Sequence, residues 1–369
     1  MASDVKITKI ESYEVIHQIT DNLADSTRLV DKVGFVVVDI HTDSDLHGYA
    51  VTYHEQGGEA VQSFIKHVLE PGLVGRSPME MTALWEENFH LVRGVARKGL
   101  AFLAMSVIDI ALWDLKGKLL NQPVYRLLGG KRKEIPIYAS GGWTSYSCER
   151  LVQEAEEMVS RGYKKIKIKV GVEGGNNPNE DLRRVAAVRK AVGPDIGIMI
   201  DANNIWTSGT AVRFANQVKE YDILFFEEPV PADDIPGLAR FRSGTDLPLA
   251  TGEHEYTRFG ARDLVTSGAV DIFQADATKC GGYTETLRMN AIAMAWNIPF
   301  APHAMEYMHM HLVAAAPNGI LLERLLMFEP VADKTFVNPP QPKNGILTIP
   351  DAPGLGLEYK IEEIRKMQK

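Results

Sequence analysis

The stretch YKKIKIKVG, residues 163–171, places four lysines within six positions of a run that is otherwise β-branched and ends at Gly171. Lysine is rarely buried, so this pattern is unusual for a core strand. Side chains alternate along a strand, and Lys167 and Lys169 therefore face one way while Ile166 and Ile168 face the other. Three interpretations follow: a solvated edge, a phosphate-binding strand, or part of a catalytic site.

The surrounding sequence indicates where this strand belongs. From Ile135 onward, short apolar runs alternate with amphipathic helices. The expected strands are IPIYASGG, KIKIKV, IGIMIDAN, ILFFEEPV, PLATGE, VDIFQADA, IPFAPHA and GILLER. Helices are expected over 149–161, 180–192, 209–220, 257–267 and 283–296. This alternation predicts right-handed βαβ units with a parallel sheet, and eight strands are enough to close a TIM-type barrel.

The rest of the chain divides around this α/β series. Residues 1–130 mix expected strands (5–16 and 33–41) with expected helices (59–75, 78–91 and 98–119), an α+β pattern. We predict an N-terminal domain over 1–130, a barrel over 131–326, and a Pro- and Gly-rich segment over 327–369 that returns to the N-terminal domain. Neither GxGxxG nor GxxxxGK[ST] occurs, which disfavours a nucleotide-binding fold.

Bulk composition excludes several classes of protein. The 369 residues are 45% hydrophobic and 24% charged, as in an ordinary globular protein. A net charge of −8 and a pI near 5.7 disfavour binding to nucleic acid or to an anionic membrane. The most apolar helical run, residues 100–117, carries two aspartates and is too interrupted to span a bilayer. Cys148 and Cys280 form no disulfide or zinc pattern, so we expect a cytoplasmic protein.

Ionisable residues stand at the ends of the expected barrel strands, where TIM barrels carry their catalytic groups. They are Lys169, Asp201, Glu227, Glu253, Asp276, His303 and Glu323. Asp201, Glu227 and Glu253 are spaced 26 residues apart (227 − 201 and 253 − 227). Three converging carboxylates repel one another unless a cation neutralises them, and an all-oxygen ligand set selects Mg²⁺, with Mn²⁺ as the alternative. Singly, each carboxylate could instead cap the following helix.

The remaining strand-end groups suit proton transfer. Lys167 and Lys169 would face the barrel interior, where burial and a nearby cation lower the pKa of a lysine towards that of a general base. Lys164 and Lys165 precede the strand and are expected to be solvated. A carboxylate beside an imidazole fixes its tautomer and raises its basicity, which makes Asp276 and His303 a candidate pair. No GxSxG turn accompanies the pair, which disfavours a serine-type triad.

The order KxK, D, E, E, D, H on successive strands resembles the enolase superfamily, specifically its mandelate racemase subgroup within the mandelate racemase/muconate lactonizing enzyme family. The matching stretches are IKIKVG, DANN, FEEP, TGE, DATKCGG and PHAMEYMHMHL, with MSVIDIALWDLKGKLLNQPVYRLLGG before the barrel. The resemblance implies a (β/α)7β barrel, with an α+β capping domain built from the N-terminal region and the C-terminal tail. It also implies a symmetric homo-oligomer.

The resemblance also implies roles for single residues. Asp201, Glu227 and Glu253 would bind Mg²⁺. Lys169 would be the base on one face of the substrate, and Lys167 beside it would hold the substrate carboxylate.

Further roles follow from the same resemblance. His303, supported by Asp276, would be the acid or base on the other face, and Glu323 would hydrogen-bond the developing enediolate. Asn203 would lie close to the metal and the substrate, whereas Glu228 would be structural.

One lysine bears on the choice of subgroup. The related lactonising enzymes place a lysine where this chain has Asp276. Lys279 lies three residues further on, so strand alternation would point it away from the side of Asp276. We therefore disfavour a lactonising or dipeptide-epimerising enzyme.

The shared step of the family is removal of a proton α to a carboxylate, and the cap segments 17–32 and 52–58 would then select the substrate. Both are dense in hydroxyl, amide and charged groups, which suits a polyol better than a phenyl ring. We expect a dehydratase of a small sugar acid, resembling galactarate/talarate dehydratases. Arg28, Lys32 and His54 are candidates for its distal end, unless they form only a solvated loop face.

Several alternatives stay open. The same enediolate would serve a racemase or epimerase of a 2-hydroxy acid, or a cycloisomerase of an anhydro-sugar acid. From other classes, a Schiff-base aldolase would also use a barrel lysine but needs no carboxylate trio. A non-catalytic sugar-acid binder would have lost one of the two bases, and both Lys169 and His303 are present.

Overall fold

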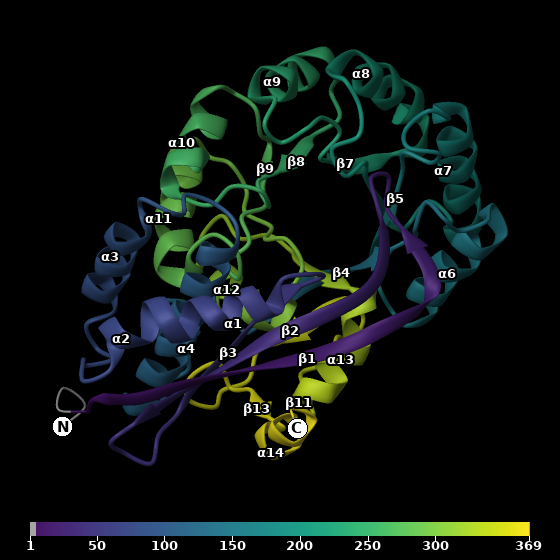
Figure 1. The fold of residues 1–369 in the computed structure, drawn as a ribbon. Coiled ribbons are helices and arrows are strands. Elements are labelled where there is room, and N and C mark those ends of the chain that lie inside the picture. Colours follow the sequence, from purple (N-terminus) through teal and green to yellow (C-terminus); the bar gives the residue numbers. More distant parts are fainter. Residues whose placement is uncertain (1–4, 369) are drawn as a thin grey trace.

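A long antiparallel hairpin forms the cap of the protein, in a computed structural model that describes residues 5–368. The three cap strands are β1 (Ile7–Ala24), β2 (Leu29–Thr42) and β3 (Gly48–His54), in the order β1-β2-β3. The hairpin sweeps from the far end of the cap to the barrel (Figure 1). Residues 17–32, expected as a loop, are therefore mostly strand, and β3 was not expected. The β-branched run of β2, which is buried from Val33 to Ile40, accounts for this pairing.

Helices of the cap cover one face of this sheet. They are α1 (Gly58–Phe64), a short π-helical turn (Ile65–Leu69), α2 (Glu70–Leu73), α3 (Met81–Val92), α4 (Leu100–Leu119) and α5 (Val124–Leu127). Helix α4 is apolar around most of its circumference because it lies between the cap sheet and the barrel. Its Asp109 accepts a hydrogen bond from the backbone N–H of Thr284 in the barrel, at 2.9 Å. Among the described residues, no helix is long and apolar enough to cross a membrane.

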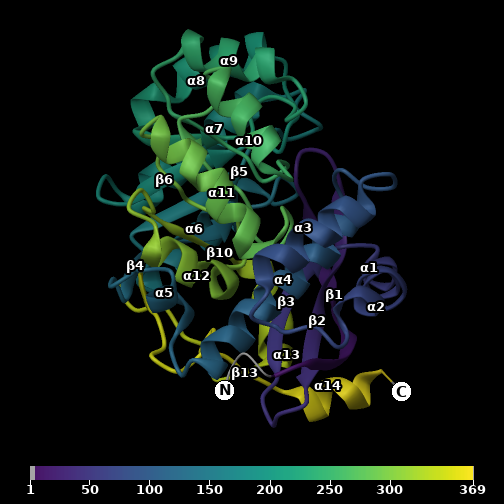
Figure 2. The same cartoon turned by 90° about the vertical axis from the view of Figure 1, so that its left-hand side faces the viewer.

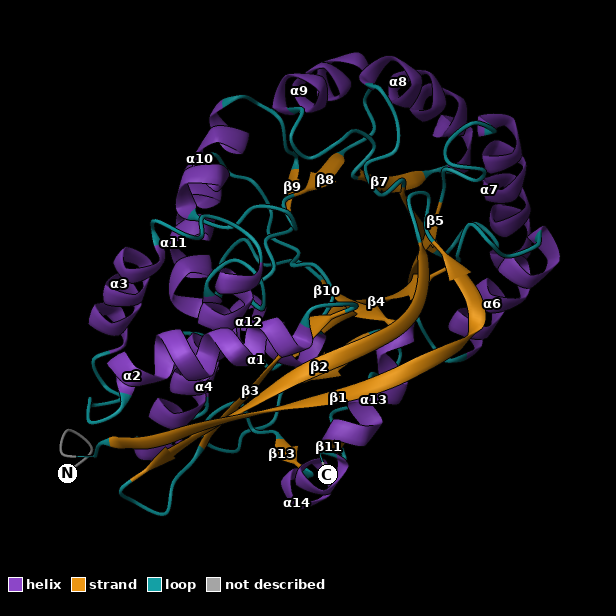
Figure 3. Ribbon diagram, viewed as in Figure 1, coloured by secondary structure: helices purple, strands orange, loops and turns teal. Residues whose placement is uncertain are grey.

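Strands and helices alternate through the barrel, with the helices on the outside (Figures 1 and 3). The strands are β4 (Glu134–Gly141), β5 (Lys165–Lys169), β6 (Gly197–Asp201), β7 (Ile223–Glu227), β8 (Leu249–Thr251), β9 (Ile272–Phe273) and β10 (Leu322–Leu325). The helices are α6 (Cys148–Ser160), α7 (Pro178–Val192), α8 (Ser208–Gln217) with a 3-10 turn (Val218–Tyr221), α9 (Ile235–Gly244), α10 (Arg258–Thr266), α11 (Gly282–Ala295) and α12 (Glu306–Ala315). The sheet order is β10-β4-β5-β6-β7-β8-β9, parallel throughout this path.

A single residue closes the gap between β9 and β10. Phe300 bridges to Phe273 on one side and to Gly319 on the other. A full strand was expected over IPFAPHA, but Pro299 and Pro302 flank the bridge and have no N–H to donate to a ladder. The expected fold class, an α/β barrel with an α+β cap, is confirmed. The domain boundaries at 130 and 326 stay predictions.

The C-terminal tail contributes to both parts of the molecule. Its elements are a 3-10 turn (Leu326–Phe328), α13 (Glu329–Thr335), β11 (Phe336–Val337), β12 (Ile346–Thr348), β13 (Glu358–Tyr359) and α14 (Ile361–Met367). Strand β12 pairs antiparallel with β4, which was not expected. Helix α14 returns to the cap, as expected (Figure 2). Its Arg365 Nε donates to the Tyr13 hydroxyl of β1 at 2.9 Å.

The tip of the β1–β2 hairpin rests on the barrel where β4 and β6 end. The Ser26 hydroxyl donates to the carbonyl oxygen of Ala202 at 2.6 Å, and Thr144 N–H donates to Ala24 O at 2.9 Å. The tip therefore stands beside the carboxyl ends of the barrel strands, where the expected site lies.

A buried aspartate of α4 links the two ends of the chain. Asp114 accepts hydrogen bonds from the backbone N–H of Tyr49 (2.9 Å) and of Leu355 (2.8 Å), and from Lys118 Nζ (2.6 Å). Asp114→Ala should lower the free energy of unfolding by about 3–5 kcal/mol, because it leaves buried donors without partners. Urea denaturation checks this, with the exposed Asp45→Ala as control; equal midpoints for the two variants would contradict it.

Candidate active site

The barrel brings the expected strand-end residues into one buried cluster. None is more than 8% exposed: Lys167, Lys169, Asp201, Glu227, Glu253, Asp276, His303 and Glu323. Parallel strands place their carboxyl ends at one edge of the sheet, which is why residues far apart in the sequence converge.

The two buried lysines of β5 are paired with carboxylates, whereas Lys165, expected to precede the strand, is its first residue. Lys167 Nζ lies 2.6 Å from Glu227 Oε1 and 2.7 Å from Glu323 Oε1. Lys169 Nζ lies 2.5 Å from Asp201 Oδ2. Burial lowers the pKa of Lys169, but the adjacent Asp201 charge outweighs it, so the pKa stands above its ordinary value. The lowered pKa that was expected depends on a cation beside the lysine, and it stays a prediction.

Negative charge is in excess around these lysines. Six buried carboxylates, from Asp201, Glu227, Glu228, Glu253, Asp276 and Glu323, face three buried lysines, Lys167, Lys169 and Lys279. Burial raises the pKa of Glu227 to about 8; the Lys167 charge opposes the rise, whereas the neighbouring carboxylates add to it. Side-chain oxygens of Asn203, Glu228 and Gln274 are buried without a hydrogen-bond partner. Surplus carboxylates with unpaired oxygens suit a hard divalent cation.

The group of potential metal ligands that lie closest together differs from the predicted trio. Glu228, Glu253 and His254 each bring a ligand atom within 4.8 Å of the other two, whereas Asp201, Glu227 and Glu253 are not grouped at that distance. The lysines account for the difference, since they draw Glu227 and Asp201 towards β5. Glu228, expected to be structural, therefore lies beside Glu253 and adds a carboxylate to the cluster.

Asp276 and His303 form the expected pair. His303 Nδ1 lies 3.0 Å from Asp276 Oδ2, and His303 Nε2 lies 3.4 Å from Glu253 Oε2. Burial lowers the pKa of His303, but the Glu253 charge and the Asp276 hydrogen bond raise it to about 9. The two neighbouring carboxylates therefore favour the protonated form of His303, whose Nε2 faces the carboxylate cluster.

Asn203 and Glu323 also lie where they were expected. The backbone N–H of Asn203 donates to Asp201 Oδ1 at 2.8 Å, and its side-chain Nδ2 donates to Oδ2 at 3.3 Å. Glu323 Oε2 accepts from Ala304 N–H at 2.8 Å while Oε1 faces Lys167. The catalytic and binding roles of all these residues stay predictions.

Two supporting residues escaped the sequence analysis. Gln274 Nε2 donates to Glu227 Oε2 at 2.7 Å. His309 Nε2 accepts from Ala277 N–H at 2.9 Å, directly after Asp276. Gln274 stands two residues before Asp276, so strand alternation could have placed both on one side. The histidine lies on a helix, and no spacing pointed to it.

Lys279 does not point away from the site, contrary to expectation. Its Nζ lies 3.9 Å from Glu253 Oε1, and the side chain is 10% exposed. Strand β9 ends at Phe273, so Asp276 to Lys279 form a turn in which alternation no longer applies. Lys279 therefore adds a cation next to the cluster, while Asp276 keeps the position beside the histidine.

A cavity of about 670 Å³ leads from the cap to this cluster. Most of its lining is polar: Asp25, Thr27, Arg28, Asp31, Lys32, His54, Glu55, Gln56, Asn203, Asn204, Glu253, His254 and Lys279. Arg28 is 59% exposed at the side chain and pairs with Glu55 at 2.9 Å. His54 is buried, with Nε2 3.0 Å from Glu14 Oε1, and burial lowers its pKa to about 4. Of the expected distal contacts, Arg28 and Lys32 thus offer charge, and His54 is neutral.

Two family profiles match the chain. Residues 12–129 match the mandelate racemase / muconate lactonizing enzyme N-terminal domain, and residues 150–364 match the enolase C-terminal domain-like family. The chain belongs to the mandelate racemase/muconate lactonizing enzyme family. It is therefore an enzyme of the enolase superfamily, as the order of motifs indicated.

Relatives in this family catalyse different reactions. The chain is 32% identical to an arabinonate dehydratase of Saccharolobus solfataricus, over 96% of each chain. It is 31% identical to a D-galactarolactone cycloisomerase of Agrobacterium fabrum, over 99% of each. A solved racemase from Streptomyces coelicolor with bound magnesium matches with a TM-score of 0.92 and 28% identity, covering 98% of this chain and 99% of that one. Membership in the family thus leaves the reaction open.

Lys167 provides a test of the charge balance in the cluster. In chelator, Lys167→Met should lower the free energy of unfolding by about 3–5 kcal/mol, because it leaves Glu227 and Glu323 buried without their cation. Added Mg²⁺ should raise the Tm of this variant more than that of the unmodified protein. Differential scanning fluorimetry measures both, with Lys165→Met on the same strand as control. Equal Mg²⁺-dependent shifts in the two variants would exclude the charge-balance explanation.

Proposed function

We propose that this protein is a Mg²⁺-dependent acid-sugar dehydratase, which removes the proton α to a carboxylate and eliminates the β-hydroxyl to give a 2-keto-3-deoxy sugar acid. One observation carries the proposal: a buried lysine at the end of β5 and a buried histidine shortly after the Phe300 bridge meet the same carboxylate cluster. Lys169 reaches it at Asp201, and His303 reaches it at Glu253. The dehydratase relative supports the reaction class.

The first step uses the lysines of β5. Lys169 Nζ takes the α-proton, and the electron pair of the C–H bond moves into the substrate carboxylate to form an enediolate. Lys167, held by Glu227 and Glu323, places a fixed positive charge beside that developing charge. Burial raises the pKa of Glu323, but the Lys167 and His303 charges outweigh it and lower the pKa to about 2. Glu323 would therefore have to take up a proton before it could donate a hydrogen bond to the enediolate.

Asp201, Glu227 and Glu253 would hold the Mg²⁺. When bound, the ion supplies Lewis-acid stabilisation of the enediolate and neutralises Asp201. Asp201 then no longer holds the proton on Lys169, and burial is left to lower the pKa of that lysine.

The second step uses His303. Its Nε2–H gives a proton to the β-hydroxyl, the C–O bond breaks, and the group leaves as water. Asp276 keeps the ring in the tautomer with a proton on Nδ1 and supports the imidazolium before transfer. The enol that remains tautomerises to the keto acid. Lys169 then loses to solvent the proton that it took from the substrate, and His303 regains one, so both residues return to their starting states.

The cavity supports a sugar acid as the substrate. A polyol finds hydrogen-bond partners along its polar wall, whereas a phenyl ring would leave these groups unpaired. Arg28 and Lys279 offer positive charge at two points of the wall, which suits a second carboxylate at the distal end of an aldaric acid.

The cycloisomerase relative carries the second candidate function. The same lysine, histidine and metal would open a lactone or an anhydro ring by expelling the ring oxygen in place of a hydroxyl. The two reactions share the enediolate and differ in the leaving group, so the substrate decides between them.

A panel of aldonic and aldaric acids, with galactarolactone and an aromatic 2-hydroxy acid, tests the reaction. We expect keto-acid formation with Mg²⁺ on at least one open-chain acid sugar, and none in chelator. ¹H NMR in D₂O and a semicarbazide assay measure product and α-proton exchange. Turnover of the lactone alone would favour the cycloisomerase. Exchange of the α-proton of the aromatic acid alone would favour the racemase. Full activity in chelator, with borohydride trapping of substrate, would favour a Schiff-base aldolase.

The two proton-transfer residues can be separated. Lys169→Met and His303→Asn should each lower kcat by about 10²–10⁴-fold, the usual contribution of a general acid or base. His303→Asn should still exchange the α-proton of one stereoisomer in D₂O, because the lysine remains. Lys165→Met serves as the control on the same strand. Full dehydration by His303→Asn would remove His303 from the acid role.

A further inference from the structure

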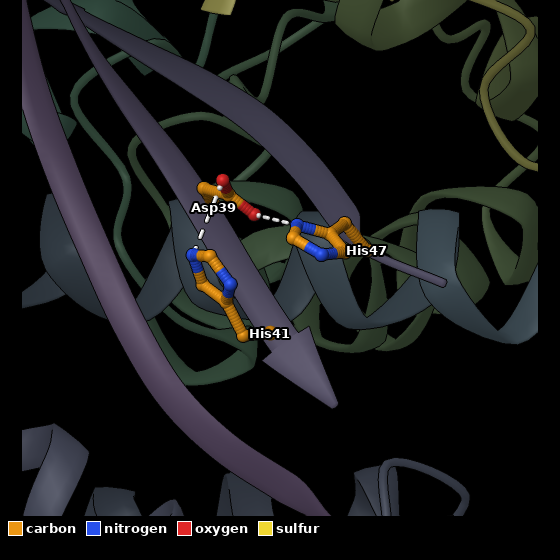
Figure 4. Close-up of side chains that lie close together, drawn as sticks. All are labelled: Asp39, His41 and His47. Atoms are coloured by element: carbon orange, nitrogen blue, oxygen red, sulfur yellow. Dashed lines mark hydrogen bonds and ion pairs between the residues drawn. The ribbon is translucent and has the colours of Figure 1, made fainter. Parts of the chain in front are cut away.

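A second group of metal-ligating side chains lies in the cap, far from the barrel. Asp39 and His41 stand two residues apart on β2 and therefore face the same side of the sheet. Glu11 of β1 is the cross-strand partner of Asp39, and His47 comes from the turn before β3. Figure 4 shows both imidazole rings turned towards the Asp39 carboxylate.

The separations between these side chains fit a four-coordinate ion. His47 Nδ1 lies 2.8 Å from Asp39 Oδ1, and His41 Nε2 lies 3.3 Å from Asp39 Oδ2. Glu11 Oε2 lies 2.8 Å from His41 Nε2, and one ligand atom from each of Asp39, His41 and His47 lies within 4.8 Å of the other two. In a tetrahedral site with bonds of about 2.0–2.1 Å, neighbouring ligand atoms stand roughly 3.3 Å apart. A small inward or outward adjustment of each side chain would reach that spacing.

The backbone holds these groups on rigid elements. Asp39 is fully buried, whereas the His41 and His47 side chains are 20% and 30% exposed, which leaves a path for an ion. Lys118 Nζ donates to the carbonyl oxygen of His47 at 2.9 Å and so anchors the turn.

Charge in the cluster is balanced only in part. Arg365 of α14 lies 3.2 Å from Glu11 Oε2 and 3.2 Å from Asp39 Oδ2. Lys9 lies 2.6 Å from Glu11 Oε1 but is 57% exposed at its side chain, and an exposed pair of this kind is screened by water. Two carboxylates therefore share one well-placed guanidinium. The other oxygen of Asp39, Oδ1, faces His47.

We propose that the cap carries a structural site for Zn²⁺ or a similar transition-metal ion, with Asp39, His41 and His47 as ligands and Glu11 or water in the fourth position. Two imidazoles with a carboxylate select zinc-like ions, in contrast to the all-oxygen trio of Asp201, Glu227 and Glu253 that would hold Mg²⁺ in the barrel. Asp39 is ten residues along β2 from Leu29 at the hairpin tip, or about 33 Å at 3.3 Å per residue. The ion would therefore join the β1–β2 pair to the turn before β3 without entering the active site.

Binding requires free lone pairs on both histidines. Without an ion, His41 Nε2 and His47 Nδ1 can each donate a proton to Asp39; with the ion, the proton moves to the other ring nitrogen. Imidazolium does not coordinate, so the ion competes with protons for both rings. A metal-free hydrogen-bonded network is the competing explanation.

The test uses chelator-treated full-length protein in saturating Mg²⁺, titrated with Co²⁺ and, separately, with Zn²⁺. We expect one equivalent of Co²⁺ to give the strong visible absorption of a tetrahedral site with nitrogen ligands, and Zn²⁺ to raise the Tm by about 3 °C or more. His41→Gln and His47→Gln should abolish the absorption and the Tm rise. Glutamine keeps a hydrogen-bond donor for Asp39, so these variants should fold as the unmodified protein does.

His67→Gln, on an exposed face of the cap, is the matched control and should bind as the unmodified protein does. Three results would overturn the proposal: no tetrahedral Co²⁺ spectrum in the unmodified protein, an unchanged spectrum in both glutamine variants, or loss of the spectrum in the control. A stable chelated protein whose Tm ignores Zn²⁺ would identify the cluster as a metal-free network.

Discussion

The ammonium group of Lys167, buried between Glu227 and Glu323, is the interaction on which the centre of this protein depends. A charge removed from water must be paired, or the group must change its protonation state. The barrel mouth gathers six carboxylates and only three lysines, so the pairing there stays incomplete. The raised pKa of Glu227 is one consequence, and the fit of the site to a divalent cation is another.

Cap and barrel contribute different parts of the candidate site. The barrel supplies the charged groups of the cluster, and the cap, through the hairpin tip and the segment at the end of β3, supplies more than half of the polar cavity wall. Ser26 and Thr144 join the two parts at this point. Substrate choice can therefore change by substitution in a short turn, while the carboxylate cluster and its lysines stay as they are. This arrangement is consistent with a family whose members act on different acids.

Much of the fold and of the site could be predicted because both depend on periodic patterns along the sequence: side-chain alternation within a strand and the repeat of strand and helix. Alternation placed Lys167 and Lys169 on one side of β5, and the repeat of strand and helix placed Asp201, Glu227 and Glu253 at one rim. The predictions failed where these patterns end, in turns and at prolines. Lys279 lies in a turn, and two prolines reduce the strand before His303 to a single bridge at Phe300. The pairing of β12 with β4 joins segments some two hundred residues apart, which no local pattern reports.

The sequence by itself determined which chemical groups this protein brings to the ends of its strands, because hydrophobic period and side-chain alternation are properties of neighbouring residues. Tertiary structure alone decided how those groups pair. It set Glu228 beside Glu253, put Lys169 on Asp201, turned Lys279 into the cavity, and collected Glu11, Asp39, His41 and His47 at the far end of the cap. Such pairings depend on distances of a few ångströms between residues far apart in the chain, and burial makes each of them matter because an unpaired charge is costly there.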